Sequence, residues 1–160
     1  AHGRRGVVSL AALHGAFVEG NATNWVQAAE QFAAAGLIAP EALTAVRRRQ
    51  AFGELIGNSD MHFGNLAFWL DDTLPLRVAP VYDMLPMLWA PVAGGEIVPC
   101  TFSPLPPTPA QVADWAVAAG WAAEFWQRVA DDALVSAEFA RIARDAGATV
   151  ARLRAHFTVS

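Results

Sequence analysis

The hydrophobic positions in the first third of the chain predict three helices. From residue 7 to residue 55 the apolar side chains recur every three to four residues, which places them on one face of a helix. Capping residues, a chain-reversing glycine and a proline suited to a first helical turn predict the boundaries, at Ser9, Asn21 or Thr23, Gly36 and Pro40. We therefore expect one helix after Ser9, a second that Gly36 ends, and a third from Pro40 to Leu55.

The last third of the chain again has helical spacing. Its pattern predicts three segments, at 112–119, 122–130 and 136–157. Thr108, which a proline follows, resembles an N-cap with a first-turn proline, and Ser136 is a second candidate cap.

Between these helical regions the pattern is that of strands and loops. Leu66–Leu70 is an apolar run of strand length, 71–73 has turn composition, and Leu76–Ala79 alternates, so the sequence predicts a β-hairpin. The proline-rich stretch 86–109 is too apolar for a disordered linker and is predicted to be an ordered loop over the core. The expected fold class is mainly α with a small β-hairpin, in one domain over residues 1–160.

The composition leaves two interpretations open. Apolar residues make up 54% of the chain and charged residues 16%, whereas charged residues are about 25% of typical soluble domains. Either the chain is a compact domain, or it is a piece of a larger fold in which a partner domain covers some of its apolar faces.

Net charge and cysteine content limit the kinds of binding partner and the cellular compartment that are expected for the chain. The formal net charge is −4, so no broad basic field exists to bind nucleic acid, and Arg47–Arg49 is interpreted as a solvated helix face. Cys100 is the only cysteine, which excludes an internal disulfide and fits a reducing compartment. No apolar run has signal-peptide or membrane-spanning character. We expect a soluble, cytoplasmic protein with neither nucleic acid nor membrane as a direct partner.

Three polar residues around the predicted hairpin suggest a common site. Asn65 lies five positions after Asp60, directly before the first strand, and Asp83 lies just past the end of the second. Because an antiparallel hairpin returns the chain to its starting point, Asn65 and Asp83 are expected to lie close together, with Asp60 on the preceding loop. One carboxamide and two carboxylates form an oxygen-only set that suits Mg²⁺, and a kinase active site uses this arrangement.

The strings LIGNSDMHFGNLAF at 55–68 and APVYDM at 79–84 resemble the signature of HipA-like kinases, the toxin kinases of bacterial type II toxin–antitoxin pairs. The resemblance implies the family's helical C-terminal lobe, with Asp60 as catalytic base and with Asn65 and Asp83 binding Mg²⁺ and, through it, ATP. It also implies an antitoxin and a translation factor, such as an aminoacyl-tRNA synthetase, as protein partners.

Two neighbouring residues have less specific interpretations. His62 either orients the loop and contacts phosphate, as a cofactor-binding residue, or is a loop histidine satisfied by local hydrogen bonds. Tyr82, beside the aspartate, is expected to serve packing rather than chemistry.

The nucleotide-gripping parts of a kinase are missing from the sequence. The chain has no glycine-rich phosphate loop and no lysine, since all 11 of its Lys and Arg residues are arginines. We therefore expect it to be a fragment of a longer kinase, folded but inactive by itself.

Two other functions stay open. Asp60, His62 and Asp83 suggest a metal-dependent phosphohydrolase, although that class needs further ligands. The apolar, proline-rich stretch Ala90–Pro109 suggests instead a non-catalytic interaction module of a toxin–antitoxin pair.

Overall fold

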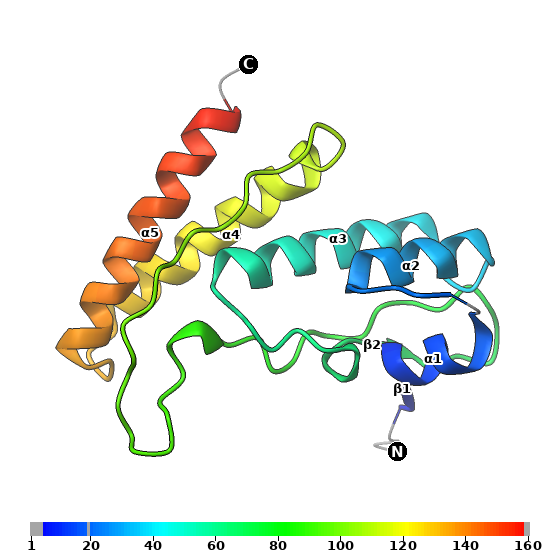
Figure 1. Cartoon of the computed structure of the whole chain (residues 1–160). Coiled ribbons are helices and arrows are strands. Elements are labelled where there is room, and N and C mark those ends of the chain that lie inside the picture. Colours follow the sequence, from blue (N-terminus) through cyan, green and yellow to red (C-terminus); the bar gives the residue numbers. More distant parts are fainter. Residues whose placement is uncertain (1–4, 19, 159–160) are drawn as a thin grey trace. The chain divides into compact units, whose positions relative to one another are not determined.

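The computed structural model describes residues 5–18 and 20–158, apart from the side chain of Thr158. The chain divides into two compact units (Figure 1). The first unit comprises Ala1–Gln50 and Met61–Met84, and the second comprises Ala51–Asp60 and Leu85–Ser160. Most of the described residues are helical, and a small antiparallel sheet accompanies them, which confirms the predicted fold class.

The helices of the first unit follow the predicted order. They are α1 (Leu10–Phe17), α2 (Trp25–Ala34) and α3 (Pro40–Leu55), and α3 continues from the first unit into the second. The Ser9 side chain accepts a hydrogen bond of 3.2 Å from the Ala12 N–H, which confirms the first predicted cap. The third helix begins at Pro40, as expected for a residue whose missing N–H costs nothing in a first turn.

The N-cap of the second helix differs from both predicted residues. Asn24, rather than Asn21 or Thr23, is the N-cap, and its side chain accepts from the Gln27 N–H at 2.9 Å. Gln27 in turn accepts from the backbone N–H of Thr23 at 2.9 Å, so the exposed N–H groups of Gln27 and Thr23 both have a side-chain acceptor. Gly36 follows the helix with φ of +69°, which confirms its predicted role as the residue that ends it.

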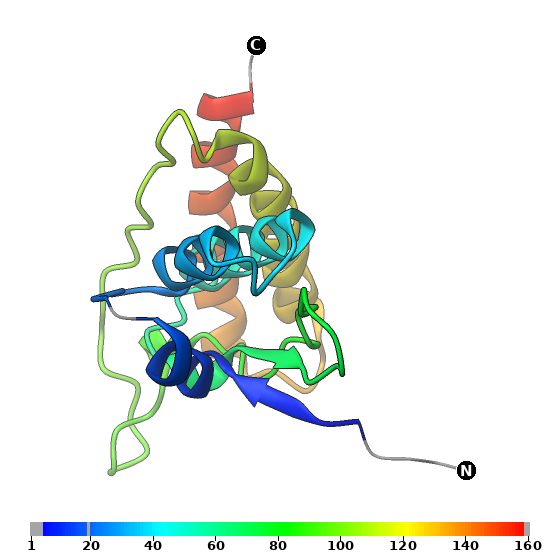
Figure 2. The same cartoon turned by 90° about the vertical axis from the view of Figure 1, so that its right-hand side faces the viewer.

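A strand that was not predicted precedes the first helix. Val7–Ser9 forms β1, which pairs antiparallel with β2 (Ala67–Trp69) (Figure 2). In this register Val8 lies opposite Phe68. The reason is local as well as tertiary. Ser9 caps α1 from an extended conformation, φ −71° and ψ 154°, and the residues before it therefore leave the helix as a strand.

The predicted hairpin is present but its second strand is short. Leu76–Ala79 contains only isolated bridges, one antiparallel to β2 and one parallel to Ile38. The Ala79 N–H donates to the Ala67 carbonyl at 2.9 Å, so the chain does return beside β2. Leu76 donates instead to Leu37 at 2.8 Å, and Pro75 has no N–H to extend the ladder.

The core of the first unit gathers the inner faces of these elements. α1, α2, the start of α3, and β2 all contribute fully buried side chains. The largest of them, each under 2% exposed, are Trp25, Phe32, Phe68, Leu10, Leu66 and Val46. Residues of β1 and β2 pack in this core together with α1 and α2. The core therefore supports the chain directly before and after the hairpin.

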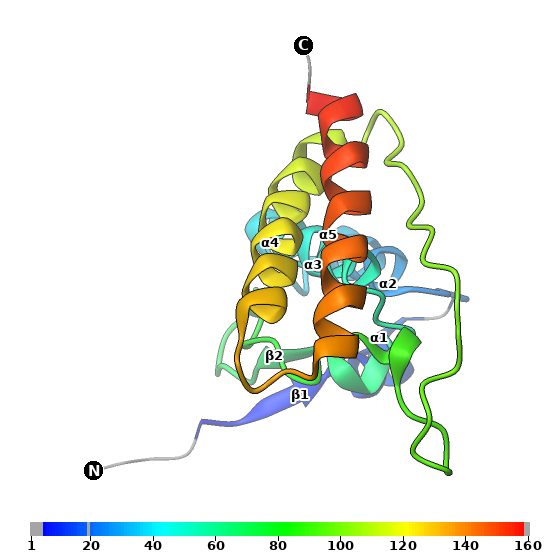
Figure 3. The ribbon, with the colours of Figure 1, turned by 90° about the vertical axis from the view of Figure 1, so that its left-hand side faces the viewer.

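The second unit contains two long helices that pack along each other, α4 (Val112–Asp131) and α5 (Ala137–Thr158) (Figure 3). The two segments predicted at 112–119 and 122–130 are one helix, so the predicted break at residue 120 is wrong. Gly120 is tolerated inside α4 because tertiary packing of buried alanines and tryptophans outweighs its low helix propensity. The Ser136 side chain accepts from the Phe139 N–H at 3.2 Å, which fits its predicted role as a cap of α5.

The proline-rich loop is packed onto an aromatic cluster of the second unit. The ring of Trp89, in the 3-10 turn Met87–Trp89, lies 5.3 Å from that of Phe102 and 5.4 Å from that of Trp126. The prediction of an ordered loop over a core is therefore confirmed at these two positions.

The predicted cap at Thr108 is wrong, because α4 begins at Val112 and Thr108 only forms a turn with Gln111. No helix among the described residues is long and apolar enough to span a membrane.

Candidate functional site

A tight turn presents Asn65 at the start of β2. His62 precedes the 3-10 turn Phe63–Asn65, and its carbonyl accepts from the Asn65 N–H at 3.0 Å. The Nδ1 atom of His62 accepts from the Gly64 N–H, also at 3.0 Å. A Cβ at position 64 would lie 2.8 Å from Cε1 of His62, so only glycine fits without moving that ring. His62 is thus at least a loop histidine with a local hydrogen bond, and its contact with phosphate stays a prediction.

Two helices hold this turn from outside. The indole N–H of Trp25, a residue 1% exposed, donates to the His62 carbonyl at 3.0 Å. The ring of His14, on α1, packs edge-on against Phe63 with 5.4 Å between ring centroids. Asn65 itself is 7% exposed and is therefore one of the buried polar residues of the chain. The turn has a rigid position because the core of the first unit fixes it.

Asp83 lies on the segment that returns from the hairpin. Its φ of +55° is in the left-handed region, which a short polar side chain such as aspartate tolerates better than most. The preceding residue, Tyr82, donates its hydroxyl to the carbonyl of Gly64. The residue before Asp83 and the residue before Asn65 are therefore in direct contact.

Asp60 belongs to the second unit, at the end of the preceding loop. It is exposed, and its N–H donates to the side-chain oxygen of Asn58 at 2.9 Å. Asn58 is 8% exposed, and its own N–H donates to Gly53 at 2.8 Å. The convergence of Asp60 with Asn65 and Asp83 stays a prediction.

Gly57 explains how the same loop turns. It has φ of +71°, and a Cβ there would lie 2.7 Å from the Trp89 ring. Its carbonyl accepts from the Leu88 N–H at 2.8 Å. Both the conformation and the close approach therefore require glycine at this position.

A charged network lies at the far end of the hairpin from Asn65 and Asp83. Asp71 accepts from Arg5 and, at 3.2 Å, from Arg77, and the Arg5 guanidinium lies 4.4 Å from the ring centre of Trp69. The hydrogen bond from Arg5 is the main reason why the pKa of Asp71 is lowered from its ordinary value, and Arg77 adds to it. This network ties the chain before β1 to the hairpin turn.

The donor set of the candidate site fits magnesium better than a softer metal. Asn65 and Asp83 offer one carboxamide and one carboxylate oxygen donor, and Mg²⁺ takes one or two protein oxygens beside water and phosphates. The Nδ1 atom of His62 already accepts from Gly64. Within 5–18 and 20–158 no group of three or more His, Cys, Asp or Glu side chains is arranged to hold a metal ion, and the phosphohydrolase alternative stays a hypothesis.

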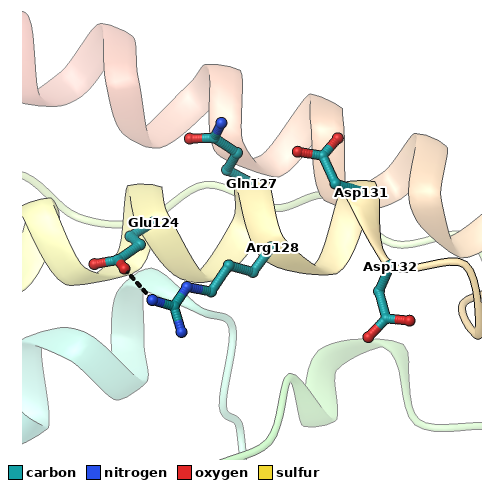
Figure 4. A pocket seen from close by; sticks show the side chains of 5 residues that line it. All are labelled: Glu124, Gln127, Arg128, Asp131 and Asp132. Carbon is teal, nitrogen blue, oxygen red and sulfur yellow. Dashed lines mark hydrogen bonds and ion pairs between the residues drawn. The ribbon is translucent and has the colours of Figure 1, made fainter.

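A hollow on α4 holds none of the predicted site residues. It is lined by Glu124, Gln127, Arg128, Asp131 and Asp132 (Figure 4). Glu124 and Arg128 form an exposed ion pair of 2.5 Å one helical turn apart, and the other side chains are exposed as well. Solvated charges of this kind contribute little and indicate no ligand.

The sequence reasoning missed three residues that position the site. Trp25 and Asn58 were not singled out, because a donor or acceptor for a distant backbone group leaves no periodic signal. Tyr82 was expected to serve packing rather than chemistry, and the hydrogen bond that it donates to the Gly64 carbonyl, from a residue 42% exposed, was not expected. Its place directly before Asp83 was the available signal.

Comparison with known proteins agrees with the motif. A family model, the HipA-like C-terminal domain, matches residues 2–157. Toxin YjjJ of Escherichia coli (strain K12) is 36% identical over 143 residues, which cover 89% of this chain and 32% of the relative. The chain thus spans about a third of that relative's length, and no solved structure matches it. Since the family match covers nearly the whole chain, the chain belongs to the HipA-like C-terminal domain family.

Proposed function

We propose that this chain is the catalytic lobe of an ATP-dependent serine/threonine protein kinase that acts as a toxin of the HipA type. Family membership and the similarity to a toxin support the class. The observation that best supports the proposed magnesium site is the hydrogen bond from Tyr82 to Gly64. It joins the residue directly before Asp83 to the residue directly before Asn65.

Asp60 is the proposed base. Its side chain is exposed, so a substrate hydroxyl can reach it, while Asn58 fixes the backbone beneath it. In the proposed reaction, the hydroxyl oxygen of a serine or threonine bonds to the γ-phosphorus of ATP, the bond to the β-phosphate oxygen breaks, and ADP leaves. Asp60 orients the hydroxyl and accepts its proton.

Asn65 and Asp83 are the residues proposed to hold magnesium. Magnesium, when bound with ATP, supplies neutralisation of the phosphate charge. The proposed role of Asn65 and Asp83 is to hold one amide oxygen and one carboxylate oxygen at a fixed separation. The rigid turn at 62–65 serves this purpose for Asn65.

We propose that phosphoryl transfer at a useful rate needs residues other than these 160. The chain has neither a glycine-rich phosphate loop nor a lysine. We expect the isolated chain to fold but to transfer no phosphate, and robust ATP-dependent phosphorylation by it would contradict this expectation. An antitoxin and a translation factor such as an aminoacyl-tRNA synthetase are the proposed protein partners, and the cytoplasm is the proposed location.

The first test is phosphoryl transfer by the protein as it is encoded, with any segments that flank these residues. With Mg²⁺ and γ-labelled ATP we expect labelling of the protein or of a cell extract. Asp60→Asn and Asp83→Asn should each reduce the rate by about 10²-fold or more, because the first removes the proposed base and the second removes a proposed magnesium ligand. Asp72→Asn, an exposed hairpin aspartate, is the matched control and should keep full activity.

The second test separates a toxin kinase from an interaction module. Expression of the encoded protein in bacteria is expected to arrest growth, and Asp60→Asn and Asp83→Asn should relieve the arrest at equal protein level. Arrest that persists in both variants would contradict the kinase proposal and favour the alternative in which the proline-rich stretch Ala90–Pro109 binds a partner.

A further inference from the structure

The segment that carries Asp83 is supported at its two ends. At one end the Ala79 N–H donates to the Ala67 carbonyl at 2.9 Å, and at the other Met84 packs against the core of the first unit. The four residues between them, 80–83, are all exposed. Burial therefore does not fix the backbone at Asp83, whose φ of +55° is a conformation that aspartate adopts only at some cost.

The segment that carries Asn65 is held much more firmly. A buried tryptophan donates to the His62 carbonyl, the Asn65 N–H donates to the same carbonyl, and the His14 ring packs on Phe63. Any group that ties the first segment to this turn would transmit its rigidity to Asp83.

The Tyr82 hydroxyl makes that tie, by donating to the carbonyl of Gly64. A tyrosine ring has two side-chain torsions and a rigid length, so it acts as a stiff spacer between the two backbones. Tyr82 immediately precedes Asp83, and Gly64 immediately precedes Asn65. The bond thus joins the backbones directly before the two proposed magnesium-holding residues.

We propose that Tyr82 is a positioning residue that fixes Asp83 relative to Asn65 and so sets the affinity for the divalent cation. This inference rests on the proposed function, since it assigns Tyr82 a part in the same site. It makes Tyr82 neither a ligand nor a catalytic residue.

The predicted effect of Tyr82→Phe follows from what the substitution removes. It keeps the ring and deletes one partly exposed hydrogen bond, which corresponds to about a three- to tenfold loss in affinity. We expect cation binding to weaken by that factor, with phosphoryl transfer at saturating Mg²⁺ nearly unchanged. A merely structural role would lower the thermal stability and leave this dependence on cation concentration alone.

The test is a titration of Mn²⁺, as a paramagnetic substitute for Mg²⁺, by electron spin resonance. It uses the encoded protein with a non-hydrolysable ATP analogue. Tyr82→Phe is compared with Val81→Ala, a neighbour of similar exposure, 41% against 42%, and with Asp83→Ala. Weaker binding in Tyr82→Phe, wild-type binding in Val81→Ala and lost binding in Asp83→Ala would support the proposal. Wild-type binding in Tyr82→Phe with lost binding in Asp83→Ala would overturn this inference alone. Unchanged binding in Asp83→Ala would overturn the proposed function itself.

A second measurement needs no substitution at Tyr82, in case Tyr82→Phe folds poorly. Tyr82 is the only tyrosine of these 160 residues, so 3-fluorotyrosine introduces one reporter here for ¹⁹F NMR. Addition of Mg²⁺ and the ATP analogue should shift its resonance with the midpoint of cation binding, and Asp83→Asn should abolish the shift. A resonance that stays fixed through saturation would overturn the proposal.

Discussion

The two units each hold one end of the segment from Leu55 to Asn65, and each uses a buried indole to do so. In the second unit Trp126 donates to the Leu55 carbonyl at 3.1 Å, and in the first unit Trp25 donates to the His62 carbonyl at 3.0 Å. Both tryptophans are 1% exposed. Anchoring a functional loop by its backbone leaves its side chains available for chemistry.

The surroundings of the two anchors differ. Trp126 lies in an aromatic cluster, with ring contacts to Trp89, Phe102 and Phe125. The turn beside Trp25 also packs on a hydrophobic core, but it has in addition polar contacts, such as those from Gly64 to His62 and from Tyr82 to Gly64. Close packing makes a buried side chain hard to replace but does not orient polar groups. A hydrogen bond orients its donor and acceptor, although it contributes little net free energy to folding. We infer that the second unit stabilises the loop and that the first unit orients its polar groups.

The largest expected effect is in the aromatic cluster. Trp126→Ala should lower the free energy of unfolding by about 3 to 5 kcal/mol, because it creates a cavity and leaves the Leu55 carbonyl without its donor. Urea denaturation followed by circular dichroism measures this change. Trp121→Ala on the same helix is the matched control, since Trp121 is 45% exposed, and its effect should be small. Equal losses in the two variants would show that α4 is not organised around Trp126.

The next effect separates backbone conformation from packing. Gly57→Ala should cost about 2 to 4 kcal/mol, since it combines a positive φ with a Cβ only 2.7 Å from the Trp89 ring. Gly36→Ala has a similar φ of +69° but no atom within 4 Å of the added Cβ, so about 1 kcal/mol is expected. The difference between their unfolding midpoints measures the close approach to Trp89 alone.

A smaller change tests the polar anchor. Trp25→Phe keeps an aromatic ring in the core but removes the indole donor from the His62 carbonyl, which still accepts from the Asn65 N–H, at a cost of about 1 kcal/mol. Hydrogen exchange of the Asn65 amide, which donates to that carbonyl, should accelerate by more than global destabilisation explains. Trp126→Phe is the control from the other unit, and it should leave the Asn65 amide with no such extra acceleration.

The smallest effect concerns the exposed network at Asp71. Its pKa is lowered from 3.8 in the folded chain by Arg5 first and Arg77 second, so the ionised form favours folding. This contribution is therefore present above the unfolded pKa and is lost as the pH falls through the folded pKa. Asp71→Asn should lower the melting temperature slightly at pH 7 and in low salt, and the difference should vanish in acid and in high salt. A difference that persists in strong acid would contradict the ion-pair origin.

Local rules predicted those features of the fold whose cause lies within a few residues. The caps at Ser9 and Ser136, the glycine stop at Gly36 and the start at Pro40 all depend on backbone geometry next to the residue concerned. The prediction of Asn21 or Thr23 as the cap of α2 failed because Asn24 can cap equally well, and only the bond from the Gln27 N–H to Asn24 identifies the cap.

For the candidate site, the sequence predicted the family but not the residues that support the loops. The spacing of Asp60, Asn65 and Asp83 and the strings around them pointed to the family that the comparison then confirmed. The residues that hold the loops were invisible, because Trp25 is 37 positions from the carbonyl it binds and Tyr82 is 18. No periodic pattern encodes such pairs.

By itself, then, the sequence determined the helical class, most helix ends and the family, since these follow from periodicity, local hydrogen bonding and motif. Only the tertiary structure decided that Val7–Ser9 pairs as a strand, that α4 runs through Gly120, and that Tyr82 joins the two proposed metal-holding segments. Each of these depends on a partner far away in the chain, and the energy of that contact outweighs the local preference of the residues involved.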